Sequence, residues 1–231
     1  MKKTFFTYWM MLAFLSPLLV SCDNEGDDLG SGSNAHEYVD LGLPSGLKWA
    51  TCNVGATTPE EYGNYYCWGE IEIEMGDYDW SAYSWSYDAY NTMTKYNTNE
   101  LFGFKGFVDG KNVLDAEDDV AAVLWGGNWR MPTKLEVQEL IDNCEWEWTL
   151  QNGVKGCRVA SKVNGNSIFL PAAGSMEDDE LISESINGCY WTKSLHEKVT
   201  NSAYQLLFGI SYRNAYYSYR NNGYVVRPVC K

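Results

Sequence analysis

The stretch Trp125-Gly-Gly-Asn-Trp-Arg-Met-Pro-Thr133, followed by Lys-Leu-Glu136, decides how this 231-residue chain folds. Thr133 and Glu136 have the spacing of a capping box, in which a hydroxyl and a carboxylate satisfy main-chain amides at the start of a helix. Trp129 and Met131 can fill a core beside that helix. The apolar positions that follow have the helical period and predict a helix from Thr133; they are Val137, Leu140, Ile141 and Cys144.

The rest of the sequence predicts one further helix and many short strands. The helix is predicted to open at Asp115 and to stop at Gly126-Gly127. Asn152-Gly153 and Asn164-Gly165 suit tight hairpin turns, because these residues tolerate positive φ. Residues 78–99 are expected to form a long ordered loop. Two main helices with many short antiparallel strands define an α+β domain, and the expected strands are residues 47–52, 65–68, 157–163, 167–170, 189–192, 203–208 and 224–229.

The N-terminus has the three parts of a secretory signal. Lys2 and Lys3 precede an apolar run over residues 5–20, which is too short and too interrupted to favour a membrane span. Leu19-Val20-Ser21-Cys22 resembles the bacterial lipobox, in which the cysteine thiol is acylated before cleavage. Residues 1–21 are therefore predicted to be a lipoprotein signal peptide, with Cys22 as the lipid attachment site. The alternative is a plain secretory signal with a chance cysteine.

Residues 22–37 are predicted to be a flexible acidic tether, because they are rich in Gly, Ser and acid and have almost nothing to bury. An acidic stretch just after the lipidated cysteine resembles the surface-export signal of lipoproteins of gut Bacteroidetes. The protein is therefore expected at the outer membrane, held by its lipid anchor and exposed at the cell surface. The globular domain is expected over residues 38–231.

The composition limits the partners. The net charge is -14, and an acidic surface repels nucleic-acid phosphates and anionic lipid headgroups. No nucleic acid is therefore expected as a partner, and no membrane contact beyond the lipid anchor. The cysteines after Cys22 lack C-x2-C spacing and only 2 His are present, so no metal site and no cofactor is predicted. The sequence leaves disulfides and buried free thiols open for these cysteines.

Four segments together resemble a known family. They are residues 38–55, Tyr65-Tyr-Cys-Trp-Gly-Glu70, the stretch 125–133 with its helix, and Val225-Val-Arg-Pro-Val229. The chain resembles the large paralogous surface-lipoprotein family of Fibrobacter and Bacteroidetes. Its Trp-Arg-Met-Pro-Thr is similar to the Trp-Arg-Leu-Pro-Thr of formylglycine-generating-enzyme-like domains, which implies a C-type-lectin-like fold over residues 38–231. Arg130 in this motif is expected to pair with a buried acceptor.

No catalytic constellation is found in the sequence. It has no Gly-rich phosphate loop, no Gly-x-Ser-x-Gly elbow and no His-Glu-x-x-His. The resemblance leaves one enzymatic alternative, an oxidase related to formylglycine-generating enzymes, which predicts two cysteines close together in a cleft. Cys157 and Cys189 are not matched to that pair by sequence. Two acidic runs, residues 117–119 and 177–180, are interpreted as solvated groups rather than calcium sites.

Residues 211–224, Ser-Tyr-Arg-Asn-Ala-Tyr-Tyr-Ser-Tyr-Arg-Asn-Asn-Gly-Tyr, have the composition of antibody paratopes. A hydrophobic core would not select so many hydroxyl and amide groups, because each would need a buried partner. The wider segment 190–229 resembles the C-terminal region of variable proteins diversified by retroelements. We predict a non-catalytic adhesion face for a protein or glycan ligand, formed by Tyr212, Asn214, Tyr216, Tyr217, Tyr219, Asn221 and Asn222.

Two interpretations of this segment remain beside the adhesion face. The rings can belong to a half-exposed aromatic strand pair without a ligand. The protein can also be a structural component of a surface assembly, which predicts an exposed apolar patch or an edge strand that matches a partner.

Overall fold

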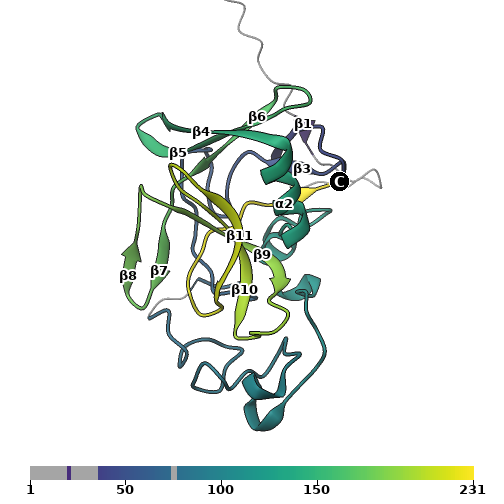
Figure 1. Cartoon of the computed structure of the whole chain (residues 1–231), viewed down its shortest axis with the longest axis vertical. Coiled ribbons are helices and arrows are strands. Elements are labelled where there is room, and N and C mark those ends of the chain that lie inside the picture. The colour runs from purple at the N-terminus through teal and green to yellow at the C-terminus, as the bar shows by residue number, and fades with distance from the viewer. Residues whose placement is uncertain (1–19, 22–35, 74–76) are drawn as a thin grey trace, which may run out of the picture.

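The structure, a computed structural model, describes residues 20–21, 36–73 and 77–231 (Figure 1). Cys22 lies outside the described residues, as do residues 1–19 of the predicted signal peptide and residues 22–35 of the predicted tether. β1 (Val20–Ser21) pairs with β2 (Glu37–Asp40). Since β1 belongs to the predicted signal peptide, a chain cleaved before Cys22 would lack it. Within the described ranges, no helix has the length and apolar character needed to cross a membrane.

The two ends of the domain meet in one sheet of order β1-β2-β3-β12. β3 (Lys48–Ala50) lies between β2 and the C-terminal strand β12 (Val229–Cys230), and it is antiparallel to both. Trp49 lies opposite Val39 on one side and Val229 on the other, and its side chain is buried. Glu37, which the sequence placed in the tether, is thus the first residue of β2.

The helix α2 (Lys134–Asn143) begins with the predicted capping box. Glu136 N donates to the Thr133 hydroxyl, and Thr133 N donates to the Glu136 carboxylate at 2.7 Å. The Arg130 guanidinium donates to both oxygens of the same carboxylate, at 2.6 and 2.8 Å. The expected acceptor of Arg130 is therefore the half-buried Glu136, and the pair ties the start of α2 to the stretch before it.

The chain passes from α2 directly into a strand that the sequence analysis missed. β4 (Cys144–Gln151) pairs with β5 (Val154–Ser161), and β6 (Ser167–Pro171) completes the sheet β4-β5-β6. The turn between β4 and β5 is Asn152-Gly153, with φ of 47° and 86°, as predicted for a tight hairpin. The alternation of Trp146 and Trp148 with glutamates was the available signal for β4.

A third sheet, of order β11-β10-β9, lies beside α2 at the centre of Figure 1. Its strands are β9 (Gly188–Leu195), β10 (Ser202–Phe208) and β11 (Arg213–Tyr219). Val137 and Leu140 of α2 share a buried cluster with Leu206 and Phe208 of β10. A Cβ at Gly188 would lie 2.1 Å from the Phe208 ring, so the packing requires glycine there. A small hairpin precedes this sheet and consists of β7 (Ser175–Glu177) and β8 (Glu180–Ile182).

The first predicted helix is shorter than the sequence indicated. α1 (Val120–Trp125) is capped by Asp119, not by Asp115, and the 3₁₀ helix η3 (Ala116–Asp118) precedes it. The Asp119 carboxylate accepts from the main-chain amides of Ala121 and Ala122, and it also binds groups far along the chain. Those long-range partners fix the cap at residue 119.

Two extended segments predicted as strands do not form regular strands. Residues 65–68 are joined to residues 224–229 by the single bridge Tyr66↔Tyr224, and only Val229 of the latter segment lies in a strand. Residues 78–99 form an ordered loop as predicted, with Tyr83 and Met93 buried. The short 3₁₀ helices η1 (Glu100–Phe102) and η2 (Phe104–Gly106) follow this loop.

Arg220 fixes the long loop to the third sheet. Its side chain is 0% exposed. It donates to the Tyr83 hydroxyl at 2.8 Å and to the carbonyl oxygens of Lys95, Tyr96 and Thr200, each at 3.1 Å. One guanidinium therefore joins three segments that are distant in the sequence.

The described residues thus contain two α-helices and antiparallel strands arranged in small sheets. The α+β class predicted from the sequence is confirmed.

Candidate ligand-binding face

The strand β11 carries most of the rings predicted for a ligand face, and it is the edge strand of its sheet. Tyr216 and Tyr219 are 51% and 53% exposed, and Tyr212 and Tyr217 are 37% and 38% exposed. Asn214 is also exposed. Five of the seven predicted residues therefore present side chains to solvent from one strand and the residue before it.

Two of the predicted residues lie inside the protein. Asn221 is 6% exposed and Asn222 is 9% exposed. The Asn221 amide donates to the carbonyl oxygen of Tyr78 at 2.7 Å, and the Asn222 amide donates to the hydroxyls of Ser218 and Tyr224. Asn221 holds the turn after β11 against the long loop, and Asn222 links β11 to the residues after that turn. The face that contacts solvent therefore excludes both residues.

A ring cluster around His196, which sequence reasoning missed, extends the face at one end. The imidazole lies 4.3 Å from the Tyr217 ring and 5.2 Å from the Tyr204 ring, measured between centroids. Tyr216 stacks on Tyr217 at 5.0 Å. The Lys134 ammonium lies over the Tyr204 ring at 3.7 Å. These contacts connect the exposed Tyr216 and Tyr217 rings, through His196 and the buried Tyr204 ring, to Lys134 at the start of α2.

Hydrogen bonds set the charges of this ring cluster. Glu197 accepts from the Tyr204 hydroxyl at 2.6 Å and from Lys134 at 3.2 Å. Partial burial alone would raise the pKa of Glu197, but these hydrogen bonds lower it to about 2. Burial lowers the pKa of His196, whose Nδ1 accepts from the amides of Lys198 and Val199. The imidazole is therefore neutral near pH 7. In this form its Nδ1 can accept the two amide hydrogen bonds that hold the loop after β9.

A shallow hollow of about 340 Å³ lies along β11. Its walls are three tyrosines, two serines and a valine, without a charged side chain: Val199, Ser202, Tyr216, Tyr217, Ser218 and Tyr219. Trp80 packs edge-on against Tyr219 at 5.7 Å between centroids and supports the other end of the face. The hollow can therefore offer stacking surface and hydroxyl groups to a ligand without placing a charge against it.

The fixed positions of the rings distinguish this face from a set of mobile surface side chains. The Tyr212 hydroxyl donates to the Asn187 side chain, and Tyr217 is held by its ring contacts with His196 and Tyr204. Aromatic side chains that are already fixed lose little conformational entropy when a ligand binds. The arrangement is suited to binding.

The two cysteines considered for an oxidase are not arranged as a reactive pair. Cys157 and Cys189 are 3% and 5% exposed, and they belong to different buried apolar clusters. Burial raises the pKa of both thiols to about 12. A thiolate is the reactive form of cysteine, so these environments oppose the chemistry that the oxidase alternative requires.

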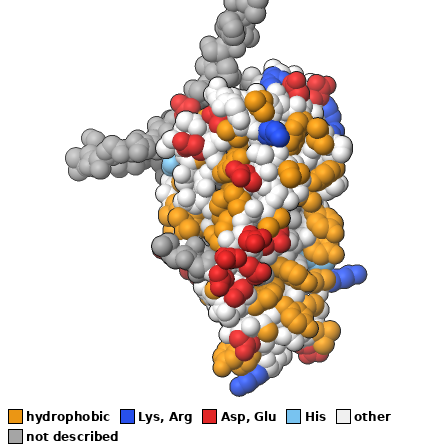
Figure 2. Space-filling model, turned by 90° about the vertical axis from the view of Figure 1, so that its left-hand side faces the viewer, with side chains coloured by type: hydrophobic (Ala, Val, Ile, Leu, Met, Phe, Trp, Pro, Cys, Tyr) orange, Lys and Arg blue, Asp and Glu red, His pale blue; other side chains and the backbone are white. Residues whose placement is uncertain are grey.

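The first of the two acidic runs, residues 117–119, lies beside lysines. Its carboxylates already have ammonium partners: Lys95 pairs with Glu117 and Asp118, and Lys193 pairs with Asp119. The second run forms the turn between β7 and β8, where Asp178 has a φ of 50°. Figure 2 shows one face of the molecule, on which acidic side chains gather beside exposed apolar ones.

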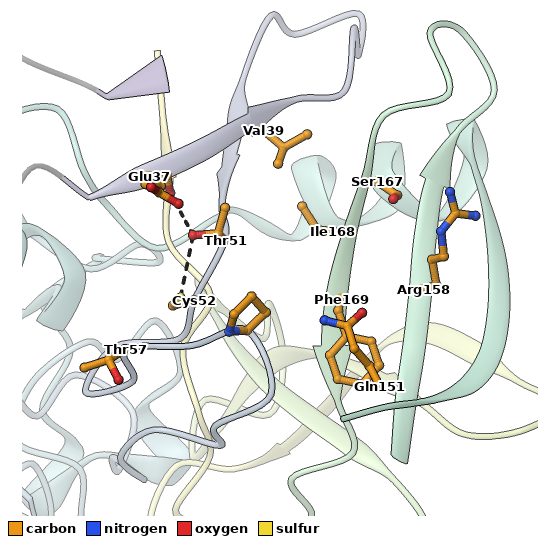
Figure 3. A pocket seen from close by; sticks show the side chains of 11 residues that line it. Glu37, Val39, Thr51, Cys52, Thr57, Gln151, Arg158, Ser167, Ile168 and Phe169 are labelled. Carbon is orange, nitrogen blue, oxygen red and sulfur yellow. Dashed lines mark hydrogen bonds between the residues drawn. The ribbon is translucent and has the colours of Figure 1, made fainter. Parts of the chain in front are cut away.

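A pocket of about 250 Å³ lies between β2, the loop after β3 and the strands β5 and β6 (Figure 3). Val39, Ile168 and Phe169 line its apolar side. The Thr51 hydroxyl is engaged by the carbonyl oxygen of Glu37 at 3.3 Å, and the Gln151 amide is engaged by Glu60. Two polar side chains of the pocket are therefore already engaged by other parts of the protein, and the pocket also exposes part of Cys52.

We expect Cys52 to react with iodoacetamide faster than Cys144, Cys157 and Cys189 in the native protein. Cys52 is half-exposed, whereas burial raises the pKa of the other three thiols to about 11 or 12. Mass spectrometry of peptides after timed labelling measures each site. Cys52→Ser should remove the fast phase and Cys144→Ser should leave it unchanged. Equal labelling rates at all four sites would contradict this accessibility order.

Comparison of the chain with protein-family models, with curated proteins and with solved structures found no match.

Proposed function

We propose that this protein is a non-catalytic, surface-anchored lipoprotein that binds a protein or glycan ligand through the Tyr-rich face of β11. The observation that carries the proposal is the exposure of three tyrosine rings of one edge strand, Tyr216, Tyr217 and Tyr219, which line an uncharged hollow. Aromatic residues with hydroxyl neighbours give large contact areas and adaptable hydrogen bonds. Such rings dominate the free energy of binding in many interfaces.

The domain is proposed to have a C-type-lectin-like fold. Three features support this. The first and last strands of the domain, β2 and β12, both pair with β3 in one sheet. The Trp-Arg-Met-Pro-Thr stretch leads into a capped helix, and that helix packs on the sheet that ends in β11. The proposed anchor is a lipid on Cys22 at the outer membrane, joined to the domain by the acidic residues before β2. Nucleic acid is not proposed as a partner, because the net charge is -14.

Simultaneous replacement of Tyr216, Tyr217 and Tyr219 by Ala is expected to abolish binding. A single aromatic anchor contributes about 2 kcal/mol or more, so loss of three should weaken affinity by more than about 100-fold. The full-length protein is first screened on glycan and protein arrays, and the affinity for each hit is then measured by calorimetry. The matched control is Tyr87→Ala with Tyr90→Ala, since these exposed rings lie in the long loop and outside the face.

The control variant should bind with unchanged affinity. If the triple variant keeps the affinity of the native protein, the ligand binds elsewhere and the proposed face is wrong.

A further inference from the structure

The outer edge of β11 presents unpaired main-chain groups at alternate residues. Gly209 N donates to Tyr212 O at 2.9 Å, and Arg220 N donates to Asn201 O at 3.0 Å. These two residue pairs lie just beyond the two ends of the β10–β11 ladder, and both are hydrogen-bonded pairs. In an antiparallel pair such positions alternate with non-bonded ones. Given the register Gln205↔Tyr216, the main-chain groups of residues 214, 216 and 218 therefore form hydrogen bonds with β10.

The odd-numbered residues of β11 point their N–H and C=O groups the other way. Arg213, Ala215, Tyr217 and Tyr219 face the open side of the sheet, where no strand among the described residues pairs with β11. At the end of the strand, the carbonyl oxygen of Tyr219 also accepts from Asn222 N at 3.2 Å, and it can accept a second hydrogen bond through its other lone pair. Proteins usually protect such edges with Pro, several charges or a bulge. β11 has seven residues, a single charge and no Pro. It is therefore free to accept another strand.

We propose that this edge pairs with the β11 strand of a second copy of the protein, antiparallel and centred on Tyr216. Two copies would then share one continuous sheet with a two-fold axis at Tyr216. In this register Arg213 lies opposite Tyr219, Asn214 opposite Ser218, and Ala215 opposite Tyr217. The inference does not rest on the proposed ligand, because it uses main-chain groups at the strand edge.

The side chains of β11 are self-complementary in that register. A guanidinium meets an aromatic ring, an amide meets a hydroxyl, and a small methyl group meets a large ring, so each pair has compatible charge or volume. The two Tyr216 rings meet on the axis in a non-hydrogen-bonded pair, where side chains approach most closely. The only charge on the strand, Arg213, stays away from its copy at the far end. If the register between the two β11 strands were shifted by two residues, so that its centre lay at Ala215, residues at the strand ends would lose their partners. Two small Ala215 side chains would then face each other.

The hydrogen-bonding phase also makes the proposal specific. Since the odd residues donate and accept at the outer edge, the strands can pair only in registers in which odd residues oppose odd residues. Centring on Tyr216 satisfies this condition and pairs all seven residues of β11. The net charge of -14 on each copy opposes association, so we expect a weak dimer that salt strengthens.

Disulfide trapping tests the register. In the full chain carrying Cys52→Ser, Tyr216→Cys should form a covalent dimer under mild oxidation, because the two residues 216 face each other within disulfide reach. Tyr217→Cys is the matched control, since its copy is displaced by two residues and lies about 7–8 Å away. We expect trapping of the control to be at least about 10-fold slower. Equal rates at both positions, or no dimer with Tyr216→Cys, would overturn the proposal.

Ala215→Pro tests the same edge without a disulfide. It removes an amide that points outward, so the ladder between β10 and β11 is left intact. Sedimentation equilibrium should show concentration-dependent dimers for the native chain and monomers for the variant, with near-UV circular dichroism confirming that both are folded. A native chain that stays monomeric up to about 1 mM would overturn the proposal. The variant keeps all the rings, so a ligand that still binds it separates loss of pairing from loss of the binding face.

Discussion

Replacing the buried Arg220 by Met is expected to lower the free energy of unfolding by about 3–5 kcal/mol. The guanidinium donates to three carbonyl oxygens and one hydroxyl, and each buried acceptor that loses its donor costs about 1 kcal/mol or more. Met can fill much of the volume between Trp68 and Tyr83, which lie against the guanidinium. It cannot donate a hydrogen bond. The long loop and the segment after β9 therefore lose their common anchor.

Equilibrium unfolding in urea measures this effect. Arg213→Met is the matched control, because Arg213 is exposed on β11, and its effect should stay within about 0.5 kcal/mol. Arg220→Lys should recover only part of the loss, since one ammonium cannot reach four acceptors arranged around a planar group. A loss below about 1 kcal/mol for Arg220→Met would show that the loops hold their positions without this residue.

Replacing Asp119 by Ala is expected to destabilise the protein by about 3–4 kcal/mol. The carboxylate is 0% exposed and accepts from the amides of Ala121, Ala122 and Met131 and from the Lys193 ammonium at 3.3 Å. Its loss removes the cap of α1 and the link to the Trp-Arg-Met-Pro-Thr stretch. It also leaves the largely buried Lys193 without its carboxylate.

Asp115→Ala is the matched control for Asp119. Asp115 pairs with Lys111 at the surface, and exposed ion pairs contribute about 1 kcal/mol or less. Thermal unfolding should therefore give a clearly lower melting temperature for Asp119→Ala than for Asp115→Ala, although the two positions are only four residues apart. Similar melting temperatures for both variants would mean that Asp119 has no special role.

The sequence predicted the elements whose determinants are local. The cap of α2 depends on two residues three positions apart, and the turn between β4 and β5 depends on the dipeptide Asn152-Gly153. The exposure of the rings on β11 followed from composition, because so many hydroxyl groups could not all find buried partners. These signals need no knowledge of the rest of the chain.

The errors concern residues whose environment is set by distant partners. Asn221 is buried because its amide meets the carbonyl oxygen of Tyr78, which lies far away in the sequence. Asp119 caps α1 instead of Asp115 because Met131 and Lys193 approach it from other segments. Composition treats every Asn near the rings alike, and local spacing treats several acidic residues alike, so neither could distinguish these positions.

The same limit explains what was missed in the candidate site. His196 and Trp80 join the ring face from loops that are separate from β11 in the sequence. Nothing within a few residues of either one indicates this position. The β9–β10 connection positions His196 and the long loop positions Trp80, so both positions depend on the tertiary fold.

The pairing of β2 with β3 and of β3 with β12 determines where a pulling force would act if the chain were held by the proposed lipid anchor at its N-terminus. A pulling force that enters at residue 36 acts first on the hydrogen bonds of β2 with β3, next to the buried Trp49. The C-terminal strand lies on the other side of β3. The force is therefore resisted by the sheet of β2, β3 and β12, whereas β11 belongs to another sheet and its rings are not on the path of the force. A reporter fused after Lys231 would emerge beside the strands that resist the force.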